Sequence, residues 1–213
     1  MTGTGKTEII HLLPNGVDLE GAANHKGSSF GRPLDEQPVQ IDFENRIAID
    51  LLKVSDQHPD TAVVLEDESR NIGARHLPHY FADQMALGQF AVIEMDFEER
   101  LERLWQEYVV ERYLKTMAFF GADGENEFAC YLRDSLLRIQ KRLGGQRTKE
   151  LLASMDNAIA VQHSDNFASH RHWLSVITRD YYDPMYCYQL EKKKDRVVFR
   201  GSRDAVIEWL QHS

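Results

Sequence analysis

The chain begins with short apolar runs that alternate with longer stretches of helical spacing. Apolar runs within residues 17–20, 61–65 and 90–95 predict strands. Apolar residues recur at near-helical spacing in residues 38–54, 77–87 and 97–115, and a further helix begins near residue 7. This order predicts a parallel sheet with covering helices.

After Gly121 the pattern becomes mostly helical. Helices are predicted over residues 125–143, 148–162, 166–181 and 202–211, and two short strands over 185–190 and 196–201 across a charged turn. We therefore expect an α/β core over residues 1–120, with its first strand missing, and a mostly helical subdomain over residues 121–213.

The first seven residues, Met-Thr-Gly-Thr-Gly-Lys-Thr, have the pattern of a phosphate-binding loop that enters a helix. In this interpretation Gly3, Thr4 and Gly5 present backbone N–H groups to phosphate oxygens, Lys6 supplies a positive charge, and Thr7 holds Mg²⁺. The full pattern, called Walker A, requires one more glycine and a hydrophobic strand before Met1. We therefore expect a fragment, a truncated gene or a misassigned start. The alternative is a helix N-terminus with incidental glycines.

Two further segments fit a phosphate site. His25, Lys26, Ser28 and Ser29 are donors suited to a second anionic group, although a mobile linker also explains them. The predicted strand at 61–65 leads into Glu66-Asp67-Glu68, followed by Ser69-Arg70. Either Glu66 or Asp67 could bind Mg²⁺ there, as in a Walker B strand, while a solvated strand end is the alternative.

Composition describes an ordinary globular protein of 213 residues, 42% hydrophobic and 28% charged. No apolar run is long enough to span a bilayer and no signal peptide is recognisable, so we expect a cytoplasmic protein without a membrane partner. Cys130 and Cys187 form no C-x-x-C pair and are expected to be buried, inert thiols. The histidines follow no zinc-binding pattern.

Charge is distributed unevenly along the chain. Residues 1–130 contain 11 Lys and Arg against 24 Asp and Glu, whereas residues 131–213 contain 14 against 10. An acidic surface repels RNA, so any RNA contact is expected from the C-terminal part. A solvated helical surface is the alternative explanation of the basic residues.

Several motifs together resemble one family, the C-terminal P-loop domain of bacterial tRNA 2-selenouridine synthases. They begin with Thr2-Gly3-Thr4-Gly5-Lys6-Thr7, Asp18-Leu19-Glu20-Gly21, Ala23-Asn24-His25-Lys26-Gly27-Ser28-Ser29-Phe30-Gly31 and Phe43-Glu44-Asn45. They continue with Glu66-Asp67-Glu68-Ser69-Arg70-Asn71-Ile72-Gly73, Lys141-Arg142-Leu143-Gly144-Gly145 and Tyr181-Tyr182-Asp183-Pro184-Met185-Tyr186. Gly-Lys-Thr is widespread in nucleotide-binding proteins, but the Asn-His-Lys-Gly-Ser-Ser-Phe-Gly and Tyr-Tyr-Asp-Pro-Met-Tyr stretches are narrower signals.

The resemblance implies a fold and an activity. The fold is α/β, a P-loop NTPase-like parallel sheet with covering helices plus a helical C-terminal subdomain. The activity is that of a transferase acting on tRNA with wobble 2-thiouridine, which is geranylated from geranyl diphosphate and then selenated from selenophosphate. A role for ATP or GTP stays open. The family's rhodanese-like domain, normally in the same chain, is absent here, so this chain alone is expected to be incomplete.

The resemblance also implies roles for particular residues. Lys6, Asp67 and Arg70 are the expected catalytic residues; Gly3, Thr4, Gly5, Lys6 and Thr7 bind phosphate; His25, Lys26, Ser28 and Ser29 bind the second anion; and Thr7, Glu66 and Asp67 hold metal. From charge and residue type, rather than from the resemblance, we expect Lys141, Arg142, Tyr181 and Tyr182 to contact tRNA. Position 26 is lysine where the family pattern leads us to expect arginine, which keeps the charge but loses a two-pronged phosphate contact.

Two other classes of function remain open from the sequence. A P-loop small-molecule kinase would use the acid-ended strand, and Arg100 and Arg103 could hold the transferred phosphoryl group. A non-catalytic P-loop domain that only binds RNA or a partner protein is the other alternative.

Overall fold

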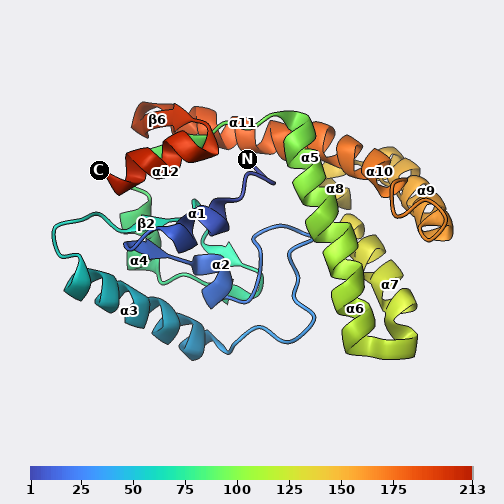
Figure 1. Ribbon diagram of the computed structural model, residues 1–213, viewed down its shortest axis with the longest axis horizontal. Coiled ribbons are helices and arrows are strands. Elements are labelled where there is room, and N and C mark those ends of the chain that lie inside the picture. The colour runs from blue at the N-terminus through green and yellow to red at the C-terminus, as the bar shows by residue number, and fades with distance from the viewer. Residues whose placement is uncertain (213) are drawn as a thin grey trace. The chain divides into compact units, whose positions relative to one another are not determined.

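A computed structural model describes residues 1–212 of the chain, which divides into two compact units (Figure 1). The mixed unit comprises Thr4–Met95 and Lys193–Ser213, and the helical unit comprises Met1–Gly3 and Asp96–Lys192. These limits differ from the division at residue 120 that the sequence suggested. The stretch after Met95 joins the helical unit, and the last 21 residues join the mixed unit.

Within the described residues, the mixed unit contains five α-helices and six short strands. In chain order they are α1 (Lys6–Leu12), β1 (Gly16–Val17), α2 (Leu19–Ala22), α3 (Gln40–Gln57), β2 (Val64–Leu65), β3 (Asn71–Ile72), β4 (Arg75–His76), α4 (His79–Met85), β5 (Phe90–Ile93), β6 (Val197–Gly201) and α12 (Arg203–Gln211). A 3₁₀ turn, η4 (Lys194–Arg196), precedes β6.

The strands form three separate two-stranded sheets. β1 is parallel to β2, with Val17 opposite Leu65, and β5 is parallel to β6, with Ala91 opposite Phe199. β3 and β4 form an antiparallel hairpin. The fold is therefore mixed α/β and mostly helical, with small parallel sheets in place of the single sheet predicted from the sequence.

Two apolar clusters hold the mixed unit together. α1 and α12 contribute Ile9, Leu13 and Val206 to one cluster, against which residues of β2, β5 and β6 pack. The other cluster joins β1, α2 and α3 through Val17, Leu19, Ala22, Ala23, Phe43, Ile47, Val54, Ile72 and Leu77. Both clusters bury one face of each amphipathic helix, which is the main source of helix stability in proteins.

The helical unit consists of helices in close contact. They are α5 (Phe97–Trp105), the π-helix η1 (Gln106–Glu111), α6 (Arg112–Phe120), the 3₁₀ turn η2 (Gly121–Asp123), α7 (Gly124–Leu137), α8 (Gln140–Leu143), α9 (Gly145–Val161), α10 (His170–Ile177), the π-helix η3 (Thr178–Tyr182) and α11 (Asp183–Lys192). Figure 1 shows α5, η1 and α6 as one continuous rod with α7 beside α6. None of the helices within residues 1–212 combines the length and apolarity needed to cross a bilayer.

Three local predictions were wrong. Residues 185–190, predicted as a strand from their aromatic content, lie in α11, and β6 pairs with β5 instead. Pro184 occupies the first turn of α11, where its fixed φ favours a helix. The predicted strand at 17–20 is only two residues long, since Asp18 caps α2 by accepting a hydrogen bond from the Gly21 N–H. Both cysteines are exposed free thiols rather than buried ones.

Candidate active site

The predicted phosphate loop turns at two glycines and leads directly into α1. Gly3 has φ 78° and Gly5 has φ 73°, both in the left-handed region that favours glycine. Gly5 is the residue before α1, and its carbonyl accepts the first helical hydrogen bond, from the Ile9 N–H at 3.2 Å. A Cβ on Gly3 would lie 2.9 Å from the Arg100 carbonyl oxygen. The close approach of this neighbour within the helical unit is therefore a second reason why position 3 needs glycine.

Lys6 and Thr7 each interact with a carboxylate of the mixed unit. The Thr7 hydroxyl donates a hydrogen bond to Glu20 Oε2 at 3.1 Å. The Lys6 ammonium lowers the pKa of Glu68, although burial and the Glu20 carboxylate outweigh it and raise that pKa to about 7. The start of α1 is thus surrounded by acidic side chains at the place where the predicted loop ends.

Glu20 is the residue of this site that sequence reasoning missed. Its Oε2 accepts from Thr7, and its Oε1 accepts from the Gly27 N–H at 2.7 Å. One side chain therefore joins α1 to the segment that carries His25 and Lys26. The sequence motif Asp18-Leu19-Glu20-Gly21 was the available signal, but its assignment to a strand concealed which way Glu20 would point.

The segment after α2 forms a closed loop. The Lys26 N–H donates to the Gly31 carbonyl at 3.0 Å, and the Gly31 N–H donates to the Ser28 carbonyl at 3.0 Å. A side chain at Gly31 would collide with the Lys26 carbonyl, and a side chain at Gly27 would collide with the Glu68 carboxylate. These contacts place the loop of Lys26, Ser28 and Ser29 against Glu68, beside the residues that interact with Thr7 and Lys6.

The three acids after β2 have different surroundings. Glu66 is 2% exposed; its Oε2 accepts from the Leu19 N–H at 3.1 Å, and its Oε1 has no hydrogen-bond partner. Burial, together with the Asp18 carboxylate, raises the pKa of Glu66 to about 8. Asp67 is exposed, and both its oxygens lie 2.6 Å from Lys193 Nζ. The sequence did not distinguish Glu66 from Asp67 as a metal ligand. In the structure Glu66 is buried and Asp67 is exposed.

Comparison with known proteins identifies the family of this chain. Residues 1–213 match the family model described as the tRNA 2-selenouridine synthase AAA domain. The chain belongs to this family. It is 47% identical over 212 residues to the tRNA 2-selenouridine synthase of Shewanella frigidimarina (strain NCIMB 400), and 46% identical over 212 residues to those of Salmonella enteritidis and Salmonella typhimurium.

Each alignment covers 99% of this chain but 58% of the relative, so the chain spans a little over half the length of these synthases. No solved structure matches the chain. The family resemblance expected from the sequence motifs is thereby confirmed.

Two arginines considered from the sequence have other contacts in this AAA-domain family member. Arg70 is exposed, and its Nε lies 3.5 Å from the Leu77 carbonyl oxygen across the β3–β4 hairpin. Arg100, considered for a kinase, is 4% exposed and donates to both carboxylate oxygens of Asp183 at 2.8 Å. Its Nη1 also lies 3.4 Å from the Thr2 carbonyl oxygen.

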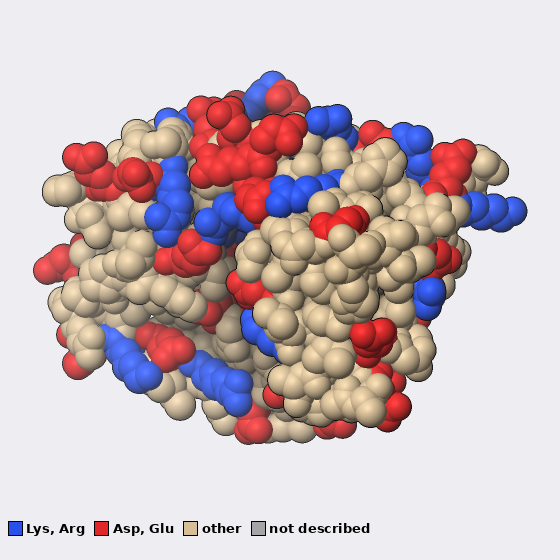
Figure 2. All heavy atoms as spheres, turned by 45° about the vertical axis from the view of Figure 1, so that its right-hand side comes forward, with Lys and Arg blue, Asp and Glu red and all other residues tan. Residues whose placement is uncertain are grey.

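The residues predicted to contact tRNA lie in the helical unit. Lys141 and Arg142 are exposed on α8, and the Arg142 guanidinium lies 4.0 Å from the Met185 sulfur. Tyr181 is half-buried, whereas Tyr182 is 4% exposed, so of the two rings Tyr181 has more of the exposure that base stacking requires. Figure 2 shows acidic and basic side chains interspersed over the displayed face, without a continuous basic surface.

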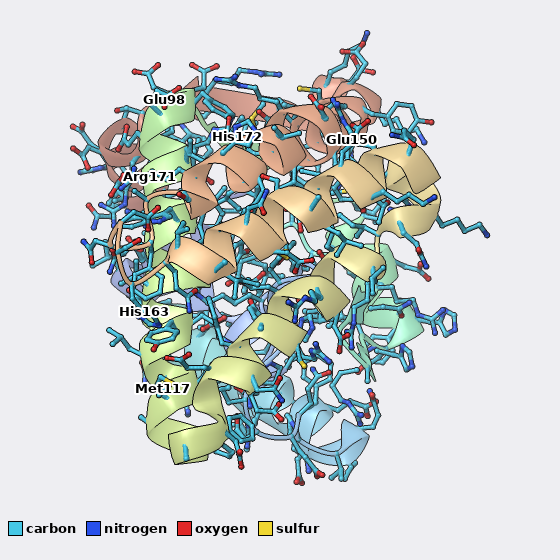
Figure 3. All side chains as sticks on the ribbon, turned by 90° about the vertical axis from the view of Figure 1, so that its right-hand side faces the viewer. Glu98, Met117, Glu150, His163, Arg171 and His172 are labelled. Atoms are coloured by element: carbon cyan, nitrogen blue, oxygen red, sulfur yellow. The ribbon has the colours of Figure 1, made fainter. Side chains whose placement is uncertain are left out.

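Another face of the helical unit is occupied by internal contacts. Figure 3 shows Arg171 and Glu98 on the same side of this unit, where α10 and α5 are in contact. The Arg171 guanidinium pairs with Glu102 and lies 3.9 Å from the centre of the Trp105 ring. Because its charge and its flat face are both engaged, Arg171 contributes to helix packing here.

A metal site here would depend on how many protein ligands lie together and on whether their atoms suit the metal ion. Within residues 1–212, no three His, Cys, Asp or Glu side chains are grouped so that they could hold a metal ion. Mg²⁺, however, is commonly held by one or two carboxylates together with substrate phosphates and water. The unpartnered Glu66 Oε1, the Thr7 hydroxyl and the Asp67 carboxylate have the oxygen chemistry that this ion prefers. Their oxygen atoms are thus chemically compatible with Mg²⁺.

Proposed function

We propose that this chain is the phosphate-handling and tRNA-engaging part of an enzyme that converts wobble 2-thiouridine in tRNA to 2-selenouridine through a geranylated intermediate. The observation that carries the proposal is Glu20, which connects Thr7 of the glycine loop to Gly27 of the second loop. Two polar loops are thereby fixed side by side in a member of the tRNA 2-selenouridine synthase AAA domain family. That arrangement suits a donor with several phosphate oxygens. We infer that the chain binds this donor with a P-loop fold.

The proposed donors are geranyl diphosphate and selenophosphate. Gly3, Thr4, Gly5, Lys6 and Thr7 bind the diphosphate, and His25, Lys26, Ser28 and Ser29, with Arg70, bind a second anionic group. In geranyl transfer, the thiouridine sulfur forms a bond to the geranyl carbon while the carbon–oxygen bond to pyrophosphate breaks, and the N3 proton of the thiouridine is released to solvent. Pyrophosphate leaves with that electron pair. Lys6 and the loop N–H groups stabilise the charge that develops on it.

Mg²⁺ fits the same proposal, held by Thr7, Glu66 and Asp67. When bound, it would neutralise part of the negative charge of the phosphorylated donor. Glu66 must lose its proton to act as a ligand, and its raised pKa therefore predicts weak metal binding below neutral pH.

Alkylation explains why a second step follows. The free thiocarbonyl sulfur is a poor leaving group, whereas the geranylated sulfur can depart as a thiolate when the selenium of selenophosphate attacks the same carbon. Water then cleaves the phosphorus–selenium bond, which releases phosphate and leaves selenium on the base. We assign tRNA contact to Lys141, Arg142, Tyr181 and Tyr182, with Tyr181 as the more exposed of the two rings. Selenation is proposed to need the rhodanese-like domain as well, in the cytoplasm where tRNA is found.

The test separates chemistry from RNA binding. Lys6→Ala, assayed with geranyl diphosphate and a tRNA carrying wobble 2-thiouridine, should reduce geranylation at least about a hundredfold because the developing pyrophosphate charge loses its cation. Binding of the same tRNA should change less than about twofold.

The matched control is Lys53→Ala. It removes an exposed lysine whose contact is with Asp50 on the same helix, and it should leave both properties unchanged. Equal loss of geranylation and tRNA binding in Lys6→Ala would contradict the proposed division of roles. ATP turnover with a small acceptor, without tRNA, would favour a kinase, and tRNA binding without any diphosphate binding would favour a non-catalytic domain.

A further inference from the structure

Asp67 already has a cationic partner, supplied by a distant part of the chain. Lys193 Nζ lies 2.6 Å from Oδ1 and 2.6 Å from Oδ2 of Asp67, 126 residues away in sequence. We propose that Lys193 is a built-in counter-ion at Asp67 that a divalent cation has to displace, so that this lysine limits metal affinity. The inference rests on the proposed function only in taking Asp67 as a metal ligand.

Lys193 is held in place by more than this ion pair. Its Nζ lies 5.0 Å from the centre of the Phe90 ring, within the range of a cation–π interaction. Its carbonyl oxygen accepts a hydrogen bond from the Arg196 N–H at 2.9 Å, and the chain then enters β6, which pairs with β5. Arg196 donates to the Gly88 carbonyl at 3.2 Å, just before β5. The lysine is therefore directed to Asp67 by its surroundings.

The charges around Asp67 explain why a cation is needed there and why a stronger one would compete. Glu66 precedes it and Glu68 follows it, and the Asp67 charge adds to the influences that raise the pKa of Glu68. One ammonium offsets a single negative charge. A divalent cation carries two positive charges and takes carboxylate oxygens as ligands, so it would compete with the ammonium for the Asp67 carboxylate.

Bidentate contact makes the competition direct. Because Lys193 approaches both oxygens of Asp67, metal coordination by either oxygen requires the ammonium to withdraw. The pair is partly exposed, with 25% of the Lys193 side chain and 44% of the Asp67 side chain accessible to solvent. Partly exposed pairs are weak, so we expect a modest barrier to metal binding rather than a block.

The experiment measures metal binding alone, without tRNA or donor. Mn²⁺, as a paramagnetic probe of a magnesium site, is titrated into the chain and its Lys193→Gln variant, with free Mn²⁺ followed by electron paramagnetic resonance. Lys193→Gln should bind Mn²⁺ about three- to tenfold more tightly, and Lys193→Arg should remain within about twofold of the unchanged chain. Thermal unfolding of each variant checks that the fold is retained.

Lys192→Gln is the matched control, because it makes the same change in net charge at the neighbouring position. Lys192 lies against Tyr188, with Nζ 4.2 Å from the ring centre, and should leave the Mn²⁺ affinity unchanged. Unchanged or weaker Mn²⁺ binding by Lys193→Gln, an equal gain in Lys192→Gln, or no Mn²⁺ binding by any of the proteins would overturn the inference. The outcome is independent of geranylation, so failure of that activity would not be mistaken for failure here.

Discussion

The two units of this chain bury different kinds of residue. In the helical unit the interior is apolar and deep, with Phe128, Leu132 and Trp173 fully buried. In the mixed unit the strands are short and all four residues of β5 are only half-buried, but Phe43 and Ile72 are fully buried as well. Both units therefore have an apolar interior, and the mixed unit differs in also burying a carboxylate, Glu66. Substitutions of buried apolar residues should act on stability, and substitutions of the mixed unit's carboxylates on its polar loops.

The largest expected effect is loss of packing in the helical unit. Phe128 is 0% exposed, and its ring lies edge-on to that of Tyr113 at 5.3 Å between centres. Phe128→Ala should lower the free energy of unfolding by about 3–5 kcal/mol, because a large buried side chain is replaced by a cavity. Urea denaturation followed by circular dichroism measures this change.

Phe119→Ala is the matched control for Phe128→Ala. It removes the same side chain from α6, where it is 59% exposed, and should cost less than about 1 kcal/mol. Similar losses from the two substitutions would mean that burial does not distinguish these positions, and the comparison between the units would lose its basis.

A second effect concerns a largely buried ion pair of the helical unit. Arg100 has a 5% exposed side chain, and Asp183 is its bidentate partner with 21% exposed. Asp183→Asn leaves the guanidinium buried without a counter-charge and should destabilise the protein by about 2–4 kcal/mol in the same denaturation experiment. Glu111→Gln, which breaks an exposed pair with Lys115, should cost less than about 0.5 kcal/mol.

That ion pair also shows where sequence reasoning stops. Amphipathic spacing predicted α3 and α5, and the helix predicted from residue 202 is α12, which Ser202 caps by accepting from the Ala205 N–H. These signals are local. Arg100 and Asp183 are 83 residues apart, and no local pattern connects them. The same holds for Asp67 and Lys193.

The family was predictable from the sequence, whereas the contacts around the candidate site were not. Motif order led to the family, which the family match confirms. The phosphate-binding role of the loop around Lys6 stays a prediction. The role of Glu20 was missed because a wrong strand assignment at residues 17–20 hid the helical turn that directs its side chain. Aromatic content similarly led us to predict a strand at residues 185–190. These residues form a helix instead, with a proline in its first turn and contacts to the helical unit.

The third expected effect is a response of the helical unit to pH. His170 is fully buried; its Nδ1 accepts from the Trp173 indole N–H at 3.0 Å, and its Nε2 lies 3.2 Å from Gln162 Oε1. Burial lowers the pKa of His170 to about 4, although the Asp165 carboxylate opposes this. Since protonation of Nδ1 would place two donors opposite each other, the neutral ring is the form that fits the fold.

The sign of the pH effect follows from this lowered pKa. The unfolded chain, with an ordinary histidine pKa near 6.5, binds a proton before the folded chain does. Stability from His170 is present above about pH 6.5 and is lost as the pH falls towards 4, by about 2 kcal/mol between pH 7 and pH 5. Hydrogen exchange of α10 amides, corrected for intrinsic rates, should show this loss. No difference between pH 7 and pH 5 would contradict it.

The smallest expected effect lies in the mixed unit and tests whether one carboxylate joins its two polar loops. Glu20→Ala removes the acceptor of the Gly27 N–H and of the Thr7 hydroxyl, and hydrogen exchange at Gly27 should accelerate about tenfold because a charged acceptor is lost. Glu20→Gln keeps one acceptor oxygen and should give an intermediate rate. Glu8→Ala removes a carboxylate from the neighbouring turn of α1, where it pairs with Arg203, and should leave Gly27 unchanged. If all three variants exchange at the same rate at Gly27, then the second loop is held by its internal hydrogen bonds alone, and the link between the loops does not come from Glu20.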